Sequence, residues 1–279
     1  MFAFGRKKSA RLELDIGSTA IKLVELSQAS GTGFSAIHVE NYAIGPLPIN
    51  AVVEQKIADV PAVGATTRKM VARSGTKVKR AATTLPGSAV MTKVIPMSAT
   101  LSDTEMEAQI QLESDQYIPY PIEEVNIDFD VLGPSDSGGD LVDVLQAASR
   151  RENVDDLVAA LEIGGLSTAI IDVEAYTMES ACTLLPGAGA EQAVAIVDIG
   201  ATTTTLHVLH EGRTAYTREH GFGGRQLIEE IQRHYGMDRS TGQLCHRDSG
   251  SLLRRRWRSR SAGHSSFSIP PAPSTVWTG

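Results

Sequence analysis

Apolar and polar residues alternate along two short segments that lie far apart in the chain. In the first, "LELDIGSTAIKLVEL", the alternation before and after Asp15–Thr19 predicts two strands joined by a tight turn. In the second, "VDIGATTTTLHVL", beginning at Val197, the letters Asp-Ile-Gly again stand between two alternating runs, predicted as strands over 193–199 and 203–209. A third strand toward Tyr42 follows the first pair, and the loop "HEGRTAY" follows the second. This repetition predicts two related halves of a duplicated α/β fold.

Helical spacing alternates with strand-like spacing in the rest of the chain. Residues 51–73 have a helical pattern that we expect Pro61 and Gly64 to break in two. Ser102 is predicted to cap a helix, with Glu105 completing a capping box. The remaining predicted elements are strands in 80–98 (interrupted at Pro86-Gly87), "VNIDFDVLG" and "LVDVLQAAS"; a helix in "RRENVDDLVAALEIGG" that stops at its glycines; a buried strand running into a helix in "STAIIDVEAYTMESACTLL"; and a glycine-rich turn that opens an amphipathic helix in "GFGGRQLIEEIQRHYG".

The overall composition is that of a globular protein, but the charge is unevenly distributed. The 279 residues are 42% hydrophobic and carry a net charge of −7. Six arginines and one aspartate give residues 245–279 a charge of +5, so residues 1–244 carry −12. An acidic body with 5% aromatic residues makes nucleic acid an unsuitable partner. Two cysteines and the absence of an apolar run of 18 residues favour a cytoplasmic protein without a membrane span.

The repeated turn has the residue types that hold phosphate. A glycine without a Cβ allows backbone N–H groups to approach an anion, and neighbouring hydroxyls add donors. Aspartates at the strand ends suit a hydrated Mg²⁺, and a lysine can reach a phosphate as a point charge. One such turn is weak evidence, because any turn favours these residues, but two in matching frames favour a phosphate-binding fold. The residues concerned are Asp15, Gly17, Ser18, Thr19 and Lys22 in the first turn, and Asp198, Gly200, Thr202 and Thr203 in the second.

Other motifs are absent or weak. No P-loop, zinc-protease or nucleophile-elbow sequence occurs, and "GFGG" is not a dinucleotide fingerprint. His207 and His210 are three residues apart at a strand end, where we expect both at the surface rather than on a metal.

Five stretches together resemble the PilM family, actin-like type IV pilus assembly proteins related to FtsA. The resemblance covers about residues 1–244, and the stretch "QYIPYPIEEVNIDF" is specific to it. The stretches are "LDIGSTAIKLVEL", "TTLPGSAVMTKVIPM", "QLESDQYIPYPIEEVNIDFDVLG", "VDVLQAASRRENV" and "VDIGATTTTLHVLHEGRTAYTREHGFGGRQLIEEI".

The resemblance implies an α/β, actin-like (ribonuclease H-like, duplicated) ATPase fold with an FtsA-type 1C subdomain and an incomplete second lobe. Subdomain 1A would comprise 1–88 and 149–191, subdomain 1C 89–148, and a partial subdomain 2A 192–244. The two turns would be the phosphate-1 and phosphate-2 motifs, with Asp15 and Asp198 holding Mg²⁺ through water. Gly223 and Gly224 would flank the ATP at a helix N-terminus. Glu174 would be either a water-orienting acid or an ordinary carboxylate at a helix start.

The family's role implies a cytoplasmic scaffold, peripheral to the inner membrane. It would bind the N-terminal peptide of a PilN-like inner-membrane protein in a shallow groove involving 1A and 1C, and would connect it to the pilus motor ATPases. ATP would act as a conformational ligand, self-association is a further expectation, and any ATPase activity would be weak. An active ATPase or small-molecule kinase of the actin/hexokinase superfamily is the alternative, and an FtsA-like filament protein is a third interpretation.

The sequence changes character after about residue 244. Residues 245–279 lack apolar periodicity and are rich in Arg, Ser, Pro and Gly. This change favours a frameshifted or truncated end over a genuine disordered basic tail. On that interpretation half of the nucleotide cleft is missing, and we expect weak or no binding of ATP and Mg²⁺.

Overall fold

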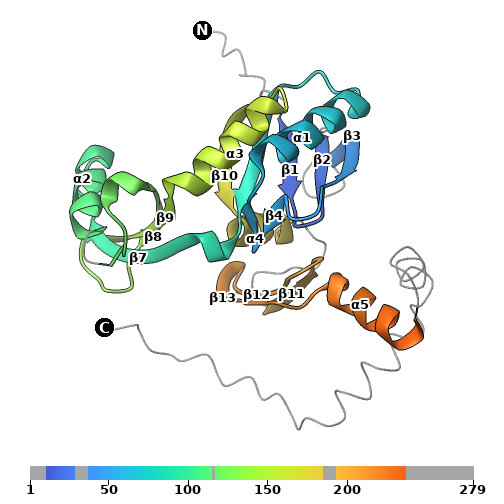
Figure 1. Cartoon of the computed structure of the whole chain (residues 1–279). Helices are drawn as coiled ribbons and strands as arrows, with labels where there is room; N and C mark the ends of the chain where they lie inside the picture. Colours follow the sequence, from blue (N-terminus) through green and yellow to red (C-terminus); the bar gives the residue numbers. More distant parts are fainter. Residues whose placement is uncertain (1–10, 29–36, 115–116, 185–192, 237–279) are drawn as a thin grey trace. The chain divides into compact units, whose positions relative to one another are not determined.

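The computed structural model describes residues 11–28, 37–114, 117–184 and 193–236 (Figure 1). Its first sheet has five strands. The strand order is β10-β6-β1-β2-β3. β1 pairs antiparallel with β2 and parallel with β6, so the first predicted hairpin lies in the middle of the sheet. The strands are β1 (Leu12–Ile16), β2 (Ala20–Gln28), β3 (Ile37–Pro46), β6 (Arg80–Leu85) and β10 (Ser167–Val173).

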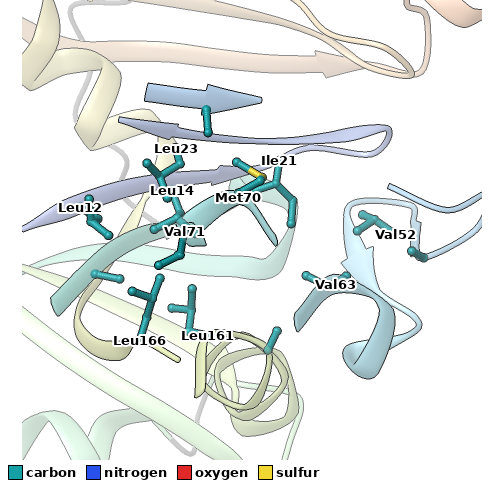
Figure 2. Close-up of a cluster of buried hydrophobic side chains, with 14 residues drawn as sticks. Leu12, Leu14, Ile21, Leu23, Val52, Val63, Met70, Val71, Leu161 and Leu166 are labelled. Atoms are coloured by element: carbon teal, nitrogen blue, oxygen red, sulfur yellow. The ribbon is translucent and has the colours of Figure 1, made fainter. Parts of the chain in front are cut away.

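Two helices pack on this sheet and on each other (Figure 1). They are α1 (Val60–Ser74) and α3 (Arg151–Ile163). Their apolar side chains meet those of β1 and β2 in the main core, where Leu12, Ile21 and Leu161 are fully buried. Figure 2 shows this cluster, with Met70 and Val71 contributed by α1. Alternate positions of β1 and β2 therefore face the helices, as the sequence pattern predicts.

The prediction that Pro61 and Gly64 interrupt the first helix is wrong. Pro61 lies in the first turn, where the missing N–H has no helical partner to lose. The Asp59 side chain caps this end by accepting from the Ala62 N–H at 2.9 Å. Gly64 lies where α1 touches α3, and a Cβ there would be 2.5 Å from the Cβ of Ile163. Gly64 therefore permits close helix packing instead of ending the helix.

A short hairpin, β4 (Val52–Val53) and β5 (Lys56–Ile57), precedes α1. These residues fall within 51–73, for which a helix is predicted, so that prediction is wrong at its N-terminal end. The two connecting residues of the hairpin, Glu54 and Gln55, have φ values of +49° and +62°. This left-handed conformation is normally adopted by Asn or Gly. Glu54 and Gln55 therefore adopt it at a cost in conformational free energy.

A second sheet, of three strands in the order β7-β9-β8, has its own core with α2 (Asp103–Ser114). Met97, Met106, Ile110 and Val144 are buried between them. The predicted capping box is present, because Ser102 and Glu105 exchange hydrogen bonds. The strands are β7 (Val90–Ser98), β8 (Val125–Pro134) and β9 (Leu141–Arg150).

The third sheet contains the second predicted hairpin, β11 (Val194–Ile199) and β12 (Thr204–His210), joined by β13 (Arg213–His220). The predicted loop "HEGRTAY" is therefore wrong in part, because Glu211 and Gly212 make a two-residue turn with positive φ into β13. Helix α4 (Glu174–Cys182) follows β10 and contacts β13. Glu179 there accepts from the N–H and hydroxyl of Thr214 at 2.7 and 2.6 Å.

β10 departs from its predicted burial. It lies at the edge of the first sheet, and none of its residues is buried. The apolar run "AII" therefore did not distinguish an edge strand from a central one.

The chain divides into two compact units, residues 1–222 and 223–279. In the second unit the structure describes α5 (Gly224–Tyr235), the predicted amphipathic helix, with Gly223 as its N-cap. Residues 245–279, where the sequence changes character, lie outside the described residues. In the described part of the chain, every helix is too short or too polar to cross a bilayer.

Candidate functional site

The two predicted turns have the same backbone geometry. The Gly17 N–H donates to the Ala20 carbonyl at 3.1 Å, and the Gly200 N–H donates to the Thr203 carbonyl at 2.9 Å. A Cβ at Gly17 would be 3.2 Å from the Ala20 oxygen, and one at Gly200 would be 2.8 Å from the Thr203 oxygen. A side chain at Gly200 would therefore clash with its turn, and one at Gly17 would crowd its turn.

The structure brings the two turns into contact, although they are far apart in sequence. The Thr202 hydroxyl donates to the Ser18 hydroxyl at 2.9 Å, across 184 residues. Two glycine turns that carry hydroxyl groups thus share one site within the first unit of the chain.

Lys22 forms an ion pair beside this contact. Its Nζ lies 2.7 Å from Oδ2 of Asp15, the opposite residue on the neighbouring strand. The hydrogen bond to Asp15 raises the pKa of Lys22, and the negative charges of Asp198 and Glu174 act in the same direction. The first turn therefore places its lysine among carboxylates from three different elements.

Glu174, the first residue of α4, has the most perturbed carboxyl of this site. Partial burial raises its pKa to about 7, and the charges of Asp198, Glu219 and Asp15 add to the effect, while Lys22 opposes it. A carboxyl that titrates near neutral pH can take or release a proton under physiological conditions. The position predicted for a water-orienting acid thus lies with both turns.

Sequence reasoning missed Glu219. It lies on β13 opposite Thr205, which in turn pairs with Asp198 on β11. The signal was the period-two pattern of "RTAYTREH", which is hidden if this segment is taken as a loop.

His207 was wrongly predicted to be at the surface, whereas His210 is exposed as predicted. His207 is 1% exposed, and its Nδ1 lies 3.4 Å from the Thr217 hydroxyl. Burial lowers its pKa, although the charges of Asp198 and Glu219 oppose that shift. The buried imidazole therefore lies on β12, between the strands that carry Asp198 and Glu219.

Gly223 and Gly224 begin α5, as the sequence predicts. The Gly223 N–H donates to the side chain of Gln226 at 3.1 Å, which helps to cap the helix. Both glycines belong to the second compact unit, so their predicted place beside the nucleotide stays a prediction.

Two sheets each carry a glycine turn, and an acidic residue starts the helix that lies between them in the sequence. This arrangement belongs to the class of actin-like ATPase folds, so the predicted fold class is confirmed. A family profile described as type IV pilus assembly protein PilM matches residues 13–250. The chain belongs to this family.

One solved structure agrees with the family assignment, and a second agrees with the fold. A structure described as the PilM-PilN type IV pilus biogenesis complex matches with a TM-score of 0.69 and 26% sequence identity. The match covers 92% of this chain and 76% of the other. The ethanolamine utilization protein EutJ from Carboxydothermus hydrogenoformans matches with a TM-score of 0.51 and 14% identity, over 90% of this chain and 65% of the other, and supports the fold alone.

Proposed function

We propose that this chain is a peptide-binding scaffold of type IV pilus assembly, at the cytoplasmic face of the inner membrane. Its partner would be the N-terminal peptide of a PilN-like membrane protein, with pilus motor ATPases and further copies of the chain as additional partners. The observation that carries the proposal is the family match over residues 13–250, together with the similarity to a PilM structure in complex with PilN. The subdomain boundaries predicted from the sequence are part of this proposal.

ATP with Mg²⁺ is the proposed conformational ligand, held by the two turns. The hydroxyls of Ser18 and Thr202 already touch, which supports one phosphate site rather than two. The lysine at this site is outnumbered by the carboxylates of Asp15, Asp198 and Glu174. A bare polyphosphate would be repelled by these carboxylates, so binding requires the cation.

The residues present fit a hydrated Mg²⁺. Among the described residues no three His, Cys, Asp or Glu side chains gather as a direct metal cage. Mg²⁺ usually keeps several waters and takes its other ligands from one or two carboxylates and the substrate phosphates. Asp15 and Asp198 would hold it through water, and the bound cation would neutralise phosphate charge. Lys22 would then contact a phosphate oxygen directly.

A small cavity supports a site for the partner peptide. Its volume is about 40 Å³, enough for the end of one side chain. It lies between the β4–β5 hairpin, the β6–β7 connection and α3, next to the proposed boundary of subdomains 1A and 1C. Apolar residues Val52, Ile57, Leu85 and Leu157 line it together with Gln55 and Asn153. We propose that one apolar side chain of the peptide occupies this cavity.

Fluorescence anisotropy with a labelled synthetic peptide tests this proposal. The peptide would carry the N-terminal sequence of the PilN-like protein encoded by the same organism. Ile57→Gln places a polar group in the cavity lining and should weaken binding at least about tenfold, because its amide would be desolvated. The matched control is Ile44→Gln on β3, where the isoleucine is 59% exposed and does not line the cavity. Absence of saturable binding by the unmodified chain would refute the scaffold proposal.

ATP hydrolysis is a second candidate activity, because Glu174 has a pKa near 7 beside both turns. Its carboxylate would accept the proton of the water that attacks the terminal phosphate. Glu174→Gln should then remove Mg²⁺-dependent phosphate release while leaving nucleotide binding in place. Equal release by the variant would exclude this role.

A further inference from the structure

A chain of hydrogen bonds joins three elements of the first unit. Oε1 of Glu219 on β13 accepts from the Ser88 N–H at 3.3 Å, across 131 residues. The Ser88 hydroxyl donates to Oε1 of Gln55 at 2.7 Å. Ser88 lies in the connection between β6 and β7, and Gln55 lies at the tip of the β4–β5 hairpin. We call this set the Glu219–Ser88–Gln55 chain.

The two ends of this chain lie at the two proposed sites. At one end Glu219 lies opposite Thr205 on β12, which in turn pairs with Asp198 just before the second turn. At the other end Gln55 lines the cavity, as do Pro86 and Ala89 on either side of the Ser88 turn.

The backbone is constrained at two points of the Glu219–Ser88–Gln55 chain. The backbone of Gln55 has a φ of +62°, a conformation that residues other than glycine rarely adopt. A Cβ at Gly87 would lie 3.2 Å from Oε1 of Glu219, closer than most real contacts. Strained backbone of this kind persists where its surroundings hold it in place. A shift of the Glu219 carboxylate would break its bond to Ser88, the residue that holds the Gln55 side chain at the hairpin tip.

We infer that the Glu219–Ser88–Gln55 chain couples nucleotide binding to peptide binding, an inference that rests on the proposed function. A cation bound at the turns attracts the Glu219 carboxylate more strongly than the uncharged Ser88 N–H does. The Ser88 N–H is then released and can donate to a backbone carbonyl of the peptide, while the Ser88 hydroxyl continues to hold the Gln55 side chain at the cavity. Nucleotide therefore raises peptide affinity, and by linkage the peptide raises nucleotide affinity by the same factor.

The experiment measures peptide affinity of the full chain by anisotropy, without nucleotide and with a saturating concentration of a non-hydrolysable Mg²⁺–ATP analogue. The ratio of the two dissociation constants is the coupling factor, expected to be about fivefold or more. Ser88→Ala keeps the N–H but removes the bond to Gln55, and Glu219→Gln keeps the shape but removes the charge. In both variants the factor should fall to about 1. Ser180→Ala, an exposed serine on α4, is the matched control and should retain it.

The outcomes separate the two proposals. If neither ligand binds the unmodified chain, the proposed function fails and this inference fails with it. If both bind with a factor of 1, only the coupling is wrong. If the factor survives Ser88→Ala and Glu219→Gln, the coupling takes another route and the inference is overturned. Gly87→Ala is an independent check, because it removes no hydrogen-bonding side chain yet crowds Glu219, and it should also lower the factor.

Discussion

Replacing Glu174 by glutamine should stabilise the protein at alkaline pH and have little effect at acidic pH. The side chain is half-buried and lies near the carboxylates of Asp198, Glu219 and Asp15, which together with burial raise its pKa from 4.5 to about 7. Glutamine keeps nearly the same shape but cannot ionise. The variant therefore removes an unfavourable charge without creating a cavity.

The sign and size follow from proton linkage. Between pH 4.5 and 7 the folded chain keeps the proton on Glu174, whereas the unfolded chain has lost it. The free energy of unfolding therefore falls as pH rises through this window. The full shift corresponds to about 3 kcal/mol, and screening of a half-buried group reduces this to about 1–2 kcal/mol. The gain from Glu174→Gln should be about 1–2 kcal/mol at pH 8 and about 0.3 kcal/mol at pH 5.

Thermal unfolding followed by circular dichroism at pH 5 and pH 8 tests this prediction. At pH 8 the variant should melt about 2–8 °C above the unmodified chain. Asp136→Asn, in the exposed β8–β9 turn, removes a carboxylate elsewhere and should give no such pH-dependent gain. An equal effect of Glu174→Gln at both pH values, or a loss of stability at pH 8, would show that the charge on Glu174 does not lower the stability of the folded chain.

Three further substitutions test the fold and the site. Gly64→Ala should lower the free energy of unfolding by about 1–3 kcal/mol in urea titrations, because its Cβ would lie 2.5 Å from Ile163. Ser102→Ala should cost about 1 kcal/mol, measured in the same way, because α2 loses its capping hydroxyl. Lys22→Gln should cost less than about 1 kcal/mol of stability, because its ion pair with Asp15 is exposed, yet weaken Mg²⁺–ATP binding about tenfold or more in calorimetry.

Control substitutions at comparable positions show whether these effects arise from the named contacts or from any substitution of the same kind. Gly221→Ala introduces a Cβ that meets no atom within 4 Å and should leave stability unchanged. Ser180→Ala, at an exposed helical position, should be neutral where Ser102→Ala is not. A stable Gly64→Ala variant would show that α1 and α3 can separate, and an unchanged ATP affinity in Lys22→Gln would remove that residue from the site.

Local patterns in the sequence predicted the hairpins and their glycines well. Alternation of apolar and polar residues around Asp15 and Asp198 predicted the strands, because a strand with one buried face has a two-residue period. The matching Asp-Ile-Gly letters predicted the duplication. The Ser102 capping box was also predictable, since it involves residues only three apart. The family assignment from five stretches of sequence is confirmed.

Features that depend on contacts between distant segments were not predictable. The residues around Gly64 do not show whether it ends a helix or allows close packing of two helices. The close contact that settles the question is with Ile163, which lies far away in the sequence. The turn at Glu54 and Gln55 lacks the usual Asn or Gly, so the β4–β5 hairpin gave no signal. Glu219 joined the site only once β13 paired with β12.

Calorimetric titration of ATP into the chain, with Mg²⁺ and then with excess chelator, tests most directly whether the two turns form one nucleotide site. Binding should be weak, should require Mg²⁺, and should weaken further, by at least about tenfold, in either Asp15→Asn or Asp198→Asn. Equal heat in the presence of chelator, or an affinity unchanged by the loss of either aspartate, would show that the two turns do not hold Mg²⁺–ATP.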